Sequence, residues 1–101
     1  MEAAFAILAE PNRRAILTLL ASSERSVGDL ERRLRLPQTS VSKHLRVLRE
    51  AGLVEVRADA RRRLYRLRPE PLQEIDAWLA PYRRLWSSAL DRLEHHLEDH
   101  P

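Results

Sequence analysis

Apolar residues recur at helical spacing in the first third of the chain, between breaks set by proline and serine. Residues 3–9 form a short apolar helix, and residues 11–22 carry too many apolar side chains for a solvated surface, which predicts a core helix. Pro11 suits the first turn of that helix, because the amide proton it lacks would have no helical partner there. Ser26 is a typical N-cap and opens a third helix over residues 26–35.

A fourth helix is predicted over residues 38–51, between two strong boundary signals. Pro37 ends the preceding helix, because proline lacks an amide proton and disfavours helical geometry in the residue before it. Gly52 ends the new helix, since glycine readily takes the left-handed conformation that follows a last helical turn. The apolar stripe of this helix occupies positions i, i+4 and i+7, namely Val41, Leu45 and Leu48. One face must therefore be buried, and residues 26–51 form a helix-turn-helix.

The middle of the chain then changes to the alternation of a β-hairpin. Residues 53–56 alternate as a half-buried strand, residues 59–61 form the tip, and residues 64–67 return as the second strand. With 101 residues and 44% hydrophobic content, residues 1–101 make one domain with a modest core. We expect a mainly α fold with a small β-hairpin wing over residues 53–68 (an α+β, winged helix-turn-helix architecture): four helices, two strands and a last helix.

The last third of the chain carries a long apolar stripe at alternating spacings of three and four. Pro71 begins the stripe and Pro81 interrupts it, so we expect a helix from about residue 72 to 96 with a kink or a break near residue 80. Ordinary core packing is the simpler interpretation, but the stripe is longer than a small domain can cover. We therefore predict dimerisation helices over residues 1–9 and 71–98, with an interface that includes Phe5, Leu72, Ile75, Leu79, Tyr82, Trp86, Leu90 and Leu93.

The outer face of the helix over residues 38–51 is rich in hydrogen-bond donors and cations. At about 100° per residue these side chains project away from the apolar stripe. Glutamine can bond adenine through two atoms, serine and threonine serve bases or phosphates, and lysine reaches guanine edges. A solvated helix face would look similar, so this pattern alone does not decide. The candidate base-reading residues are Gln38, Thr39, Ser42 and Lys43.

The distribution of charge favours nucleic-acid binding over a merely solvated face. Residues 36–68 hold nine basic and three acidic side chains, a net charge of +6. Residues 1–35 have a net charge of +1 and residues 69–101 a net charge of −4. A basic block confined to the helix and hairpin is typical of phosphate binding. The candidate phosphate-binding residues are Ser40, Arg46, Arg61, Arg62 and Arg63.

Composition excludes several function classes. The chain has no cysteine, which removes disulfides and thiolate metal sites. No apolar run approaches the roughly 20 residues of a membrane span, and the N-terminus lacks the pattern of a signal peptide, so we expect a cytoplasmic protein without membrane contact. There is no glycine-rich phosphate loop and no nucleophile elbow, so we expect no enzyme. The expected partners are double-stranded DNA and a second copy of the chain, with no cofactor.

The histidines near the C-terminus are the one hint of an effector. Asp91 and His95 share a helical face at i, i+4, as do His96 and His100, and such spacing can bind zinc or nickel. A solvated helix end is the alternative, since the helix dipole also favours imidazoles there. His44 lies beside the buried stripe of its helix and is expected to make a partly buried contact. We expect no metal site, and the sequence leaves any effector open.

The run over residues 26–67, SVGDLERRLRLPQTSVSKHLRVLREAGLVEVRADARRRLYRL, resembles the winged helix-turn-helix of the ArsR family of bacterial transcriptional regulators. The run FAILAEPNRRAILTLL resembles the opening helices of that family. The resemblance implies a homodimeric repressor that binds a palindromic operator through the major groove. It implies base reading at the same four polar positions, Gln38, Thr39, Ser42 and Lys43, and a wing at residues 61–63. The operator and the regulated genes are not determined by the sequence.

Two positions depart from the family pattern. Metal-sensing members have a Cys-Val-Cys motif in the third helix, where this chain has Ser26-Val27-Gly28, which rules out sensing through those thiolates. Ala60 stands where the wing commonly has glycine, and this predicts a looser tip rather than a tight two-residue turn. Two alternatives to the DNA-binding repressor are a metal-responsive repressor that uses the C-terminal His, Asp and Glu residues, and a winged helix that contacts protein or RNA.

Overall fold

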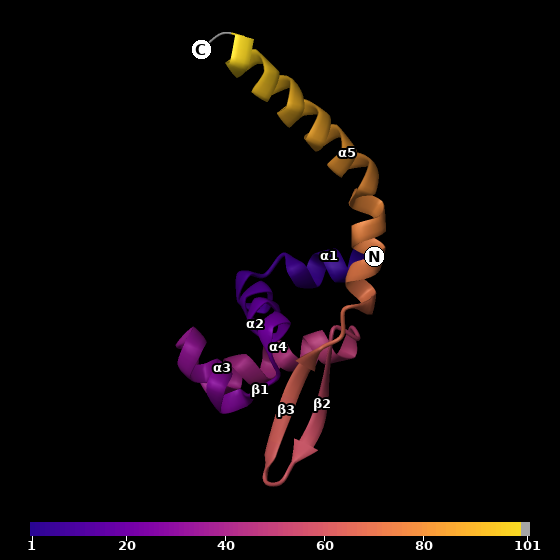
Figure 1. Ribbon diagram of the computed structural model, residues 1–101. Coiled ribbons are helices and arrows are strands. Elements are labelled where there is room, and N and C mark those ends of the chain that lie inside the picture. Colours follow the sequence, from indigo (N-terminus) through magenta and orange to yellow (C-terminus); the bar gives the residue numbers. More distant parts are fainter. Residues whose placement is uncertain (100–101) are drawn as a thin grey trace.

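The computed structural model describes residues 1–99 and has the element order of a winged helix-turn-helix (Figure 1). This confirms the predicted mainly α fold with a small sheet. None of its helices, over the described residues, has the length and hydropathy needed to span a membrane. The elements are α1 (Glu2–Leu8), α2 (Pro11–Ser22), β1 (Arg25–Ser26), α3 (Val27–Leu34), α4 (Gln38–Glu50), β2 (Val54–Asp59), β3 (Arg62–Leu67) and α5 (Glu70–Asp99).

Local capping interactions explain where the helices begin and end. The Glu10 carboxylate accepts a hydrogen bond from the Arg13 amide at 2.9 Å and caps α2. The Ser26 hydroxyl accepts one from the Asp29 amide at 3.2 Å and caps α3, as the sequence predicts. Gly52 follows α4 with φ of 76°, the left-handed conformation for which glycine is favoured.

The sheet has three strands, in the order β1-β3-β2, where the sequence predicts only a two-stranded hairpin. The additional strand is Arg25–Ser26, which pairs antiparallel with Tyr65 and Leu64 of β3. Two residues are too short to show the alternation by which strands are recognised in a sequence. This strand joins the base of the wing to the start of α3.

The prediction of a loose wing tip is wrong. The β2–β3 pairing continues to Asp59 opposite Arg62, which leaves Ala60 and Arg61 as a two-residue turn. Ala60 adopts the positive φ of 57° that the turn requires. A left-handed alanine costs only about 1–2 kcal/mol, and the long antiparallel ladder offsets that cost.

The core lies where α2, α3, α4 and the base of β2 meet. The predicted stripe of α4 is fully buried there, and Leu30 of α3 packs against it. α4 is thereby held with one face inward and the other outward. The core consists of Ile16, Leu17, Leu20, Leu30, Val41, Leu45, Leu48, Leu53 and Val54.

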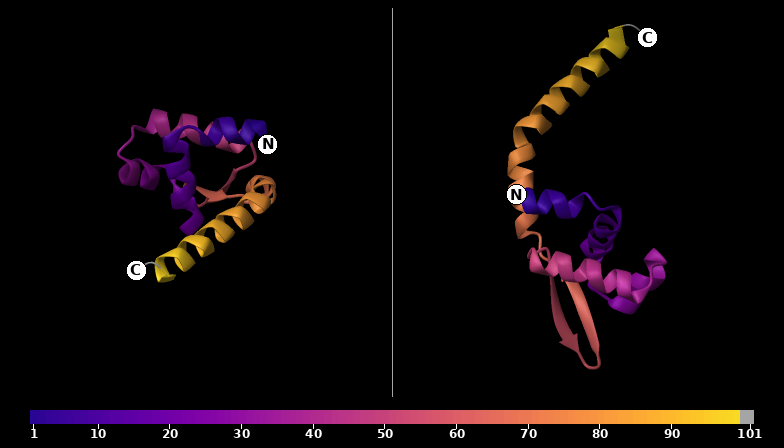
Figure 2. Two further views of the ribbon diagram at one scale, coloured as in Figure 1. Left: turned by 90° about the horizontal axis from the view of Figure 1, so that it is seen from above. Right: turned by 180° about the vertical axis from the view of Figure 1, so that it is seen from behind.

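Helix α5 continues through Pro81 and changes direction near its middle, so the proline kinks the helix and does not break it (Figures 1 and 2). None of its described residues is buried. Its first turns lie beside α1, where the Phe5 and Trp78 rings meet edge to face at 5.5 Å. Beyond the bend it projects from the body of the protein. With this projecting helix included, the molecule measures 61 × 28 × 22 Å.

Candidate nucleic-acid interface

Helix α4 presents its predicted polar face to solvent. Gln38, Thr39, Ser42 and Lys43 are all exposed, and Ser40 is half-buried. Because the apolar stripe holds the opposite face in the core, these side chains have no freedom to turn inward. The N-terminus of α4 has no side-chain cap, so its first amides remain available to an anion.

The basic side chains of α4 extend this polar face along the helix. Arg46 and Arg49 are exposed, and neither forms an ion pair within residues 1–99. They lie one and two turns beyond Ser42, on the same side of the helix. The outer face of α4 therefore offers the donors of Gln38, Thr39, Ser42 and Lys43 first and the free guanidinium groups of Arg46 and Arg49 after them.

Ion pairs give the two faces of the wing different charges. Directly paired residues of an antiparallel ladder share a face. One face holds two cross-strand pairs, Asp59 with Arg62, at 3.1 Å, and Glu55 with Arg66. The other face holds Arg63, which has no acidic partner in the part of the chain that the structure describes. The three predicted wing arginines are therefore not equivalent.

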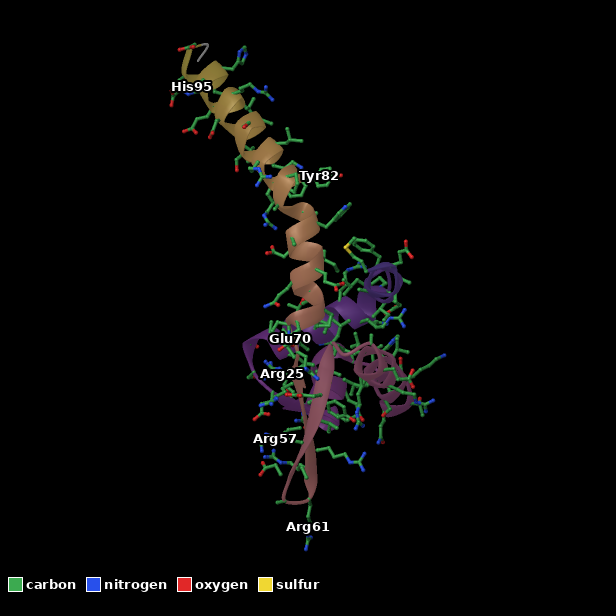
Figure 3. The ribbon with its side chains drawn as sticks, turned by 90° about the vertical axis from the view of Figure 1, so that its right-hand side faces the viewer. Arg25, Arg57, Arg61, Glu70, Tyr82 and His95 are labelled. Atoms are coloured by element: carbon green, nitrogen blue, oxygen red, sulfur yellow. The ribbon has the colours of Figure 1, made fainter. Side chains whose placement is uncertain are left out.

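Arg61 occupies the end of the wing. It follows Ala60 in the two-residue turn, and Figure 3 shows it at the point of the hairpin farthest from α5. Like Arg63, it pairs with no acid within the described residues. The free positive charge of the wing thus lies at its tip and on one face.

An ion pair fixes the wing to the body of the protein. Arg57 of β2 donates to both carboxylate oxygens of Glu24, at 2.6 and 2.9 Å, across 33 residues of sequence. This hydrogen bonding lowers the pKa of Glu24 below its ordinary value of 4.5, against a smaller opposing effect of desolvation. Arg57 lies on the side of the wing away from α4 (Figure 3). The sequence gives no sign that Arg57, unlike its neighbours, is committed to a carboxylate.

A second cluster of charges surrounds Asp29 at the start of α3. Its carboxylate accepts hydrogen bonds from Arg25 at 2.8 Å and from Arg33 at 3.0 Å. The hydrogen bond from Arg25 makes the largest contribution to lowering the pKa of Asp29 below its ordinary value of 3.8, and the bond from Arg33 adds to it. Desolvation of the carboxylate opposes both. Arg25 also donates to the Leu19 carbonyl at 3.1 Å, which ties β1 to α2. Arg25 and Arg33 are thus engaged with Asp29, and Arg25 serves the fold.

His44 makes the partly buried contact that its position predicts. Its side chain is 15% exposed, and its Nε2 lies 3.9 Å from the Glu10 carboxylate that caps α2. It points toward the inside of the domain and away from the outer face of α4. It is not a candidate base reader.

The residues predicted to form the dimer interface fall into two groups. Leu72, Ile75 and Leu79 are half-buried, and Leu72 packs against the core of its own chain. The others are exposed. The sequence prediction missed Trp78, whose ring also lies 5.2 Å from that of Tyr82, although its spacing from Tyr82 and Trp86 is helical. The exposed residues of the predicted dimer interface are Phe5, Tyr82, Trp86, Leu90 and Leu93.

Among the described residues, the C-terminal candidates for metal binding, Asp91, His95 and His96, do not come together. Within residues 1–99, no group of three or more His, Cys, Asp and Glu residues could hold a metal ion. His95 lies 3.8 Å from Glu98, and neither Asp91 nor His96 completes a ligand set with them. His100 lies outside the described residues.

Comparison with known proteins agrees with this geometry. The model of the bacterial regulatory proteins of the arsR family matches residues 10–56. The chain is 40% identical over 87 residues to an HTH-type transcriptional regulator of Mycobacterium tuberculosis, an alignment that covers 86% of this chain and 78% of that protein. It is 47% identical over 60 residues to a biofilm growth-associated repressor of Agrobacterium fabrum. That alignment covers 59% of this chain and 51% of the repressor, so the chain spans about half the length of this relative.

Solved structures extend the likeness to most of the chain. The crystal structure of a possible transcriptional regulator for arsenical resistance has a TM-score of 0.67 at 41% identity and covers 90% of this chain and 92% of its own. A homodimeric winged helix-turn-helix DNA-binding domain from Mycobacterium bovis has a TM-score of 0.65 at 30% identity. The match covers 98% of this chain and 82% of that domain.

Proposed function

Because the chain belongs to the ArsR family of bacterial regulatory proteins, we propose that it is a homodimeric, sequence-specific DNA-binding repressor. The observation that carries the proposal is the juxtaposition of an outward polar face on α4 with unpaired cations on α4 and the wing. An α-helix fits the major groove, and a basic hairpin beside it can follow the phosphate backbone. Occlusion of a promoter by the bound dimer would then repress transcription.

Four side chains of α4 are proposed to read bases. Gln38 can bond adenine through two atoms, and Lys43 can donate to guanine. Thr39 and Ser42 lie between them on the same exposed face and can donate to either base edges or phosphates. All four are held by a helix whose opposite face is buried, so their positions are preorganised for the groove.

The phosphate contacts are proposed to come from residues whose charge is free. Arg46 of α4, and Arg61 and Arg63 of the wing, have no acidic partner within the described residues, and Ser40 supplies a hydroxyl near the start of α4. Arg62 is paired with Asp59, so part of its charge is already offset within the chain. We therefore assign the wing contacts chiefly to Arg61 and Arg63.

The homodimer is proposed to form through α5 and α1, whose large apolar side chains are exposed in the single chain. A similar domain from Mycobacterium bovis is homodimeric. A two-fold dimer can place two recognition helices about 34 Å apart, in successive turns of the major groove, which predicts a palindromic operator.

Selection of bound duplexes from a random pool, with and without zinc, tests the proposal. We expect recovery of an inverted repeat whose half-sites are about one helical turn apart, with no effect of zinc. Binding that shows only the salt dependence of phosphate contacts, with no preferred sequence, would contradict it. A preference for RNA competitors over every duplex would instead identify a winged helix that binds RNA.

A further inference from the structure

Arg35 has a backbone conformation that favours glycine. It follows α3 with φ of 55° and ψ of 43°, and its amide donates to the Glu31 carbonyl to close the helix. Glycine is the usual residue at such left-handed positions, because a Cβ atom there crowds the following carbonyl oxygen. Among residues 1–99, Ala60 is the only other residue with a side chain and a positive φ. The chain therefore holds an arginine at a position where a side chain destabilises the fold.

The Arg35 side chain receives no compensation from its own chain. It is exposed, whereas Leu34 and Leu36 on either side of it pack against the core. Its guanidinium forms no hydrogen bond or ion pair with any residue that the structure describes, although Asp29 of the same helix binds other arginines. A strained residue whose side chain has no partner inside the molecule indicates a partner outside it.

The turn that contains Arg35 leads directly into α4. Gln38, the first residue of α4, follows three positions later, so the two Cα atoms are at most about 11 Å apart. Residues 36–42 carry no charged side chain. The unpaired arginines already assigned to phosphates lie farther along α4, at Arg46, and on the wing. Arg35 therefore supplies a free cation at the end of α4 that otherwise offers only the Ser40 hydroxyl.

The geometry of the major groove gives this cation a partner. A helix that lies in the groove has a phosphate backbone on each side of it, and the residues at its N-terminus contact the base edges. The turn that precedes such a helix then lies close to one of the two backbones. A guanidinium is well suited to this place, because it can donate two parallel hydrogen bonds to one phosphate.

We propose that Arg35 binds a DNA phosphate beside the start of α4, and that its left-handed conformation is retained because it holds the guanidinium there. This inference rests on the proposed DNA binding and adds a contact to it. A phosphate contact carries no sequence information, so Arg35 contributes affinity and orientation and leaves the choice of bases to the outer face of α4.

Arg35→Gly tests the proposal, because stability and DNA binding should change in opposite directions. Glycine relieves the left-handed strain, so the melting temperature should rise by about 2–8 °C. A dimer would lose two phosphate contacts, so the slope of log K against log salt concentration should fall by about 1.8, on operator and random duplexes alike. Thermal denaturation and anisotropy titrations at several salt concentrations measure the two quantities.

Two further variants separate strain from charge. Ala60→Gly relieves a φ of 57° and removes no charge, so it should raise the melting temperature by a similar amount and keep the wild-type slope. Arg35→Lys keeps both the positive charge and the strain, so its melting temperature and its slope should stay close to those of the wild type.

The possible results distinguish the phosphate contact from the DNA binding on which it rests. A melting temperature of Arg35→Gly below that of the wild type would overturn the inference, because the side chain would then stabilise the fold. An unchanged slope for Arg35→Gly, or a slope for Arg35→Lys as low as that for Arg35→Gly, would overturn it too. A wild-type protein that binds no duplex at low salt would instead overturn the proposed DNA binding itself.

Discussion

Replacement of Arg63 by alanine should weaken DNA binding in a salt-dependent manner, whereas removal of the neighbouring Asp59–Arg62 pair should not. Arg63 stands free on one face of the wing, and Arg62 is held by Asp59 at 3.1 Å on the other. The double variant Asp59→Ala/Arg62→Ala keeps the net charge of the wing and is the matched control for Arg63→Ala.

The expected change in the salt dependence of binding follows from the number of phosphates that the Arg63→Ala variant no longer binds. Each phosphate bound by a cationic side chain contributes about 0.9 to the slope of log K against log salt concentration. A dimer has two wings, so Arg63→Ala should lower the slope by about 1.8. The advantage of the wild type over the variant should then shrink about 12-fold between 50 and 200 mM salt. The double variant should keep the wild-type slope.

Fluorescence anisotropy titrations of a labelled operator duplex at four or more salt concentrations would measure both slopes. The same titrations on a random duplex should show the same loss for Arg63→Ala, because a phosphate contact carries no sequence information. An equal fall in slope for the double variant would refute the assignment, since it would mean that Arg62 binds phosphate as well as Arg63 does. An unchanged slope for Arg63→Ala would also refute it.

Three further predictions concern recognition and stability. Gln38→Ala should cost about 1–3 kcal/mol on the selected operator and leave binding to random duplexes unchanged, as measured by competition titration; equal losses on both would refute its base-reading role. Leu48→Ala should lower the free energy of unfolding by about 2–5 kcal/mol in urea denaturation, because the side chain is fully buried in the core, and a loss below about 1 kcal/mol would contradict that burial. Glu24→Gln should lower the melting temperature at pH 7, because the Glu24 carboxylate stabilises the fold there. Hydrogen bonding to Arg57 is the chief reason why the pKa of Glu24 is lowered in the folded protein. This stabilisation is present above the ordinary value of 4.5 and is lost as the pH falls through the lowered pKa, so the difference between wild type and variant should shrink in acid; a difference that grows in acid would contradict the pairing.

Much of the interface could be predicted because its determinants are local. Pro37 and Gly52 set the ends of α4 through the conformations of single residues. The i, i+4, i+7 spacing of its stripe then fixed which face is buried, and the opposite face followed from helix geometry. The exposed positions of Gln38 and Lys43 required no knowledge of the rest of the fold.

The tertiary structure decided what depends on residues far apart in the sequence or on competition between forces. No spacing rule links Arg57 to Glu24 across 33 residues, or separates the paired Arg62 from the free Arg63 beside it. The strand at Arg25 exists only because β3 offers it a partner, and the left-handed turn at Ala60 persists because the ladder beneath it outweighs its local cost. The sequence by itself determined the helices and the outward face of α4, since these follow from local geometry. Which charges remain free to meet DNA was decided by the long-range ion pairs of the folded chain.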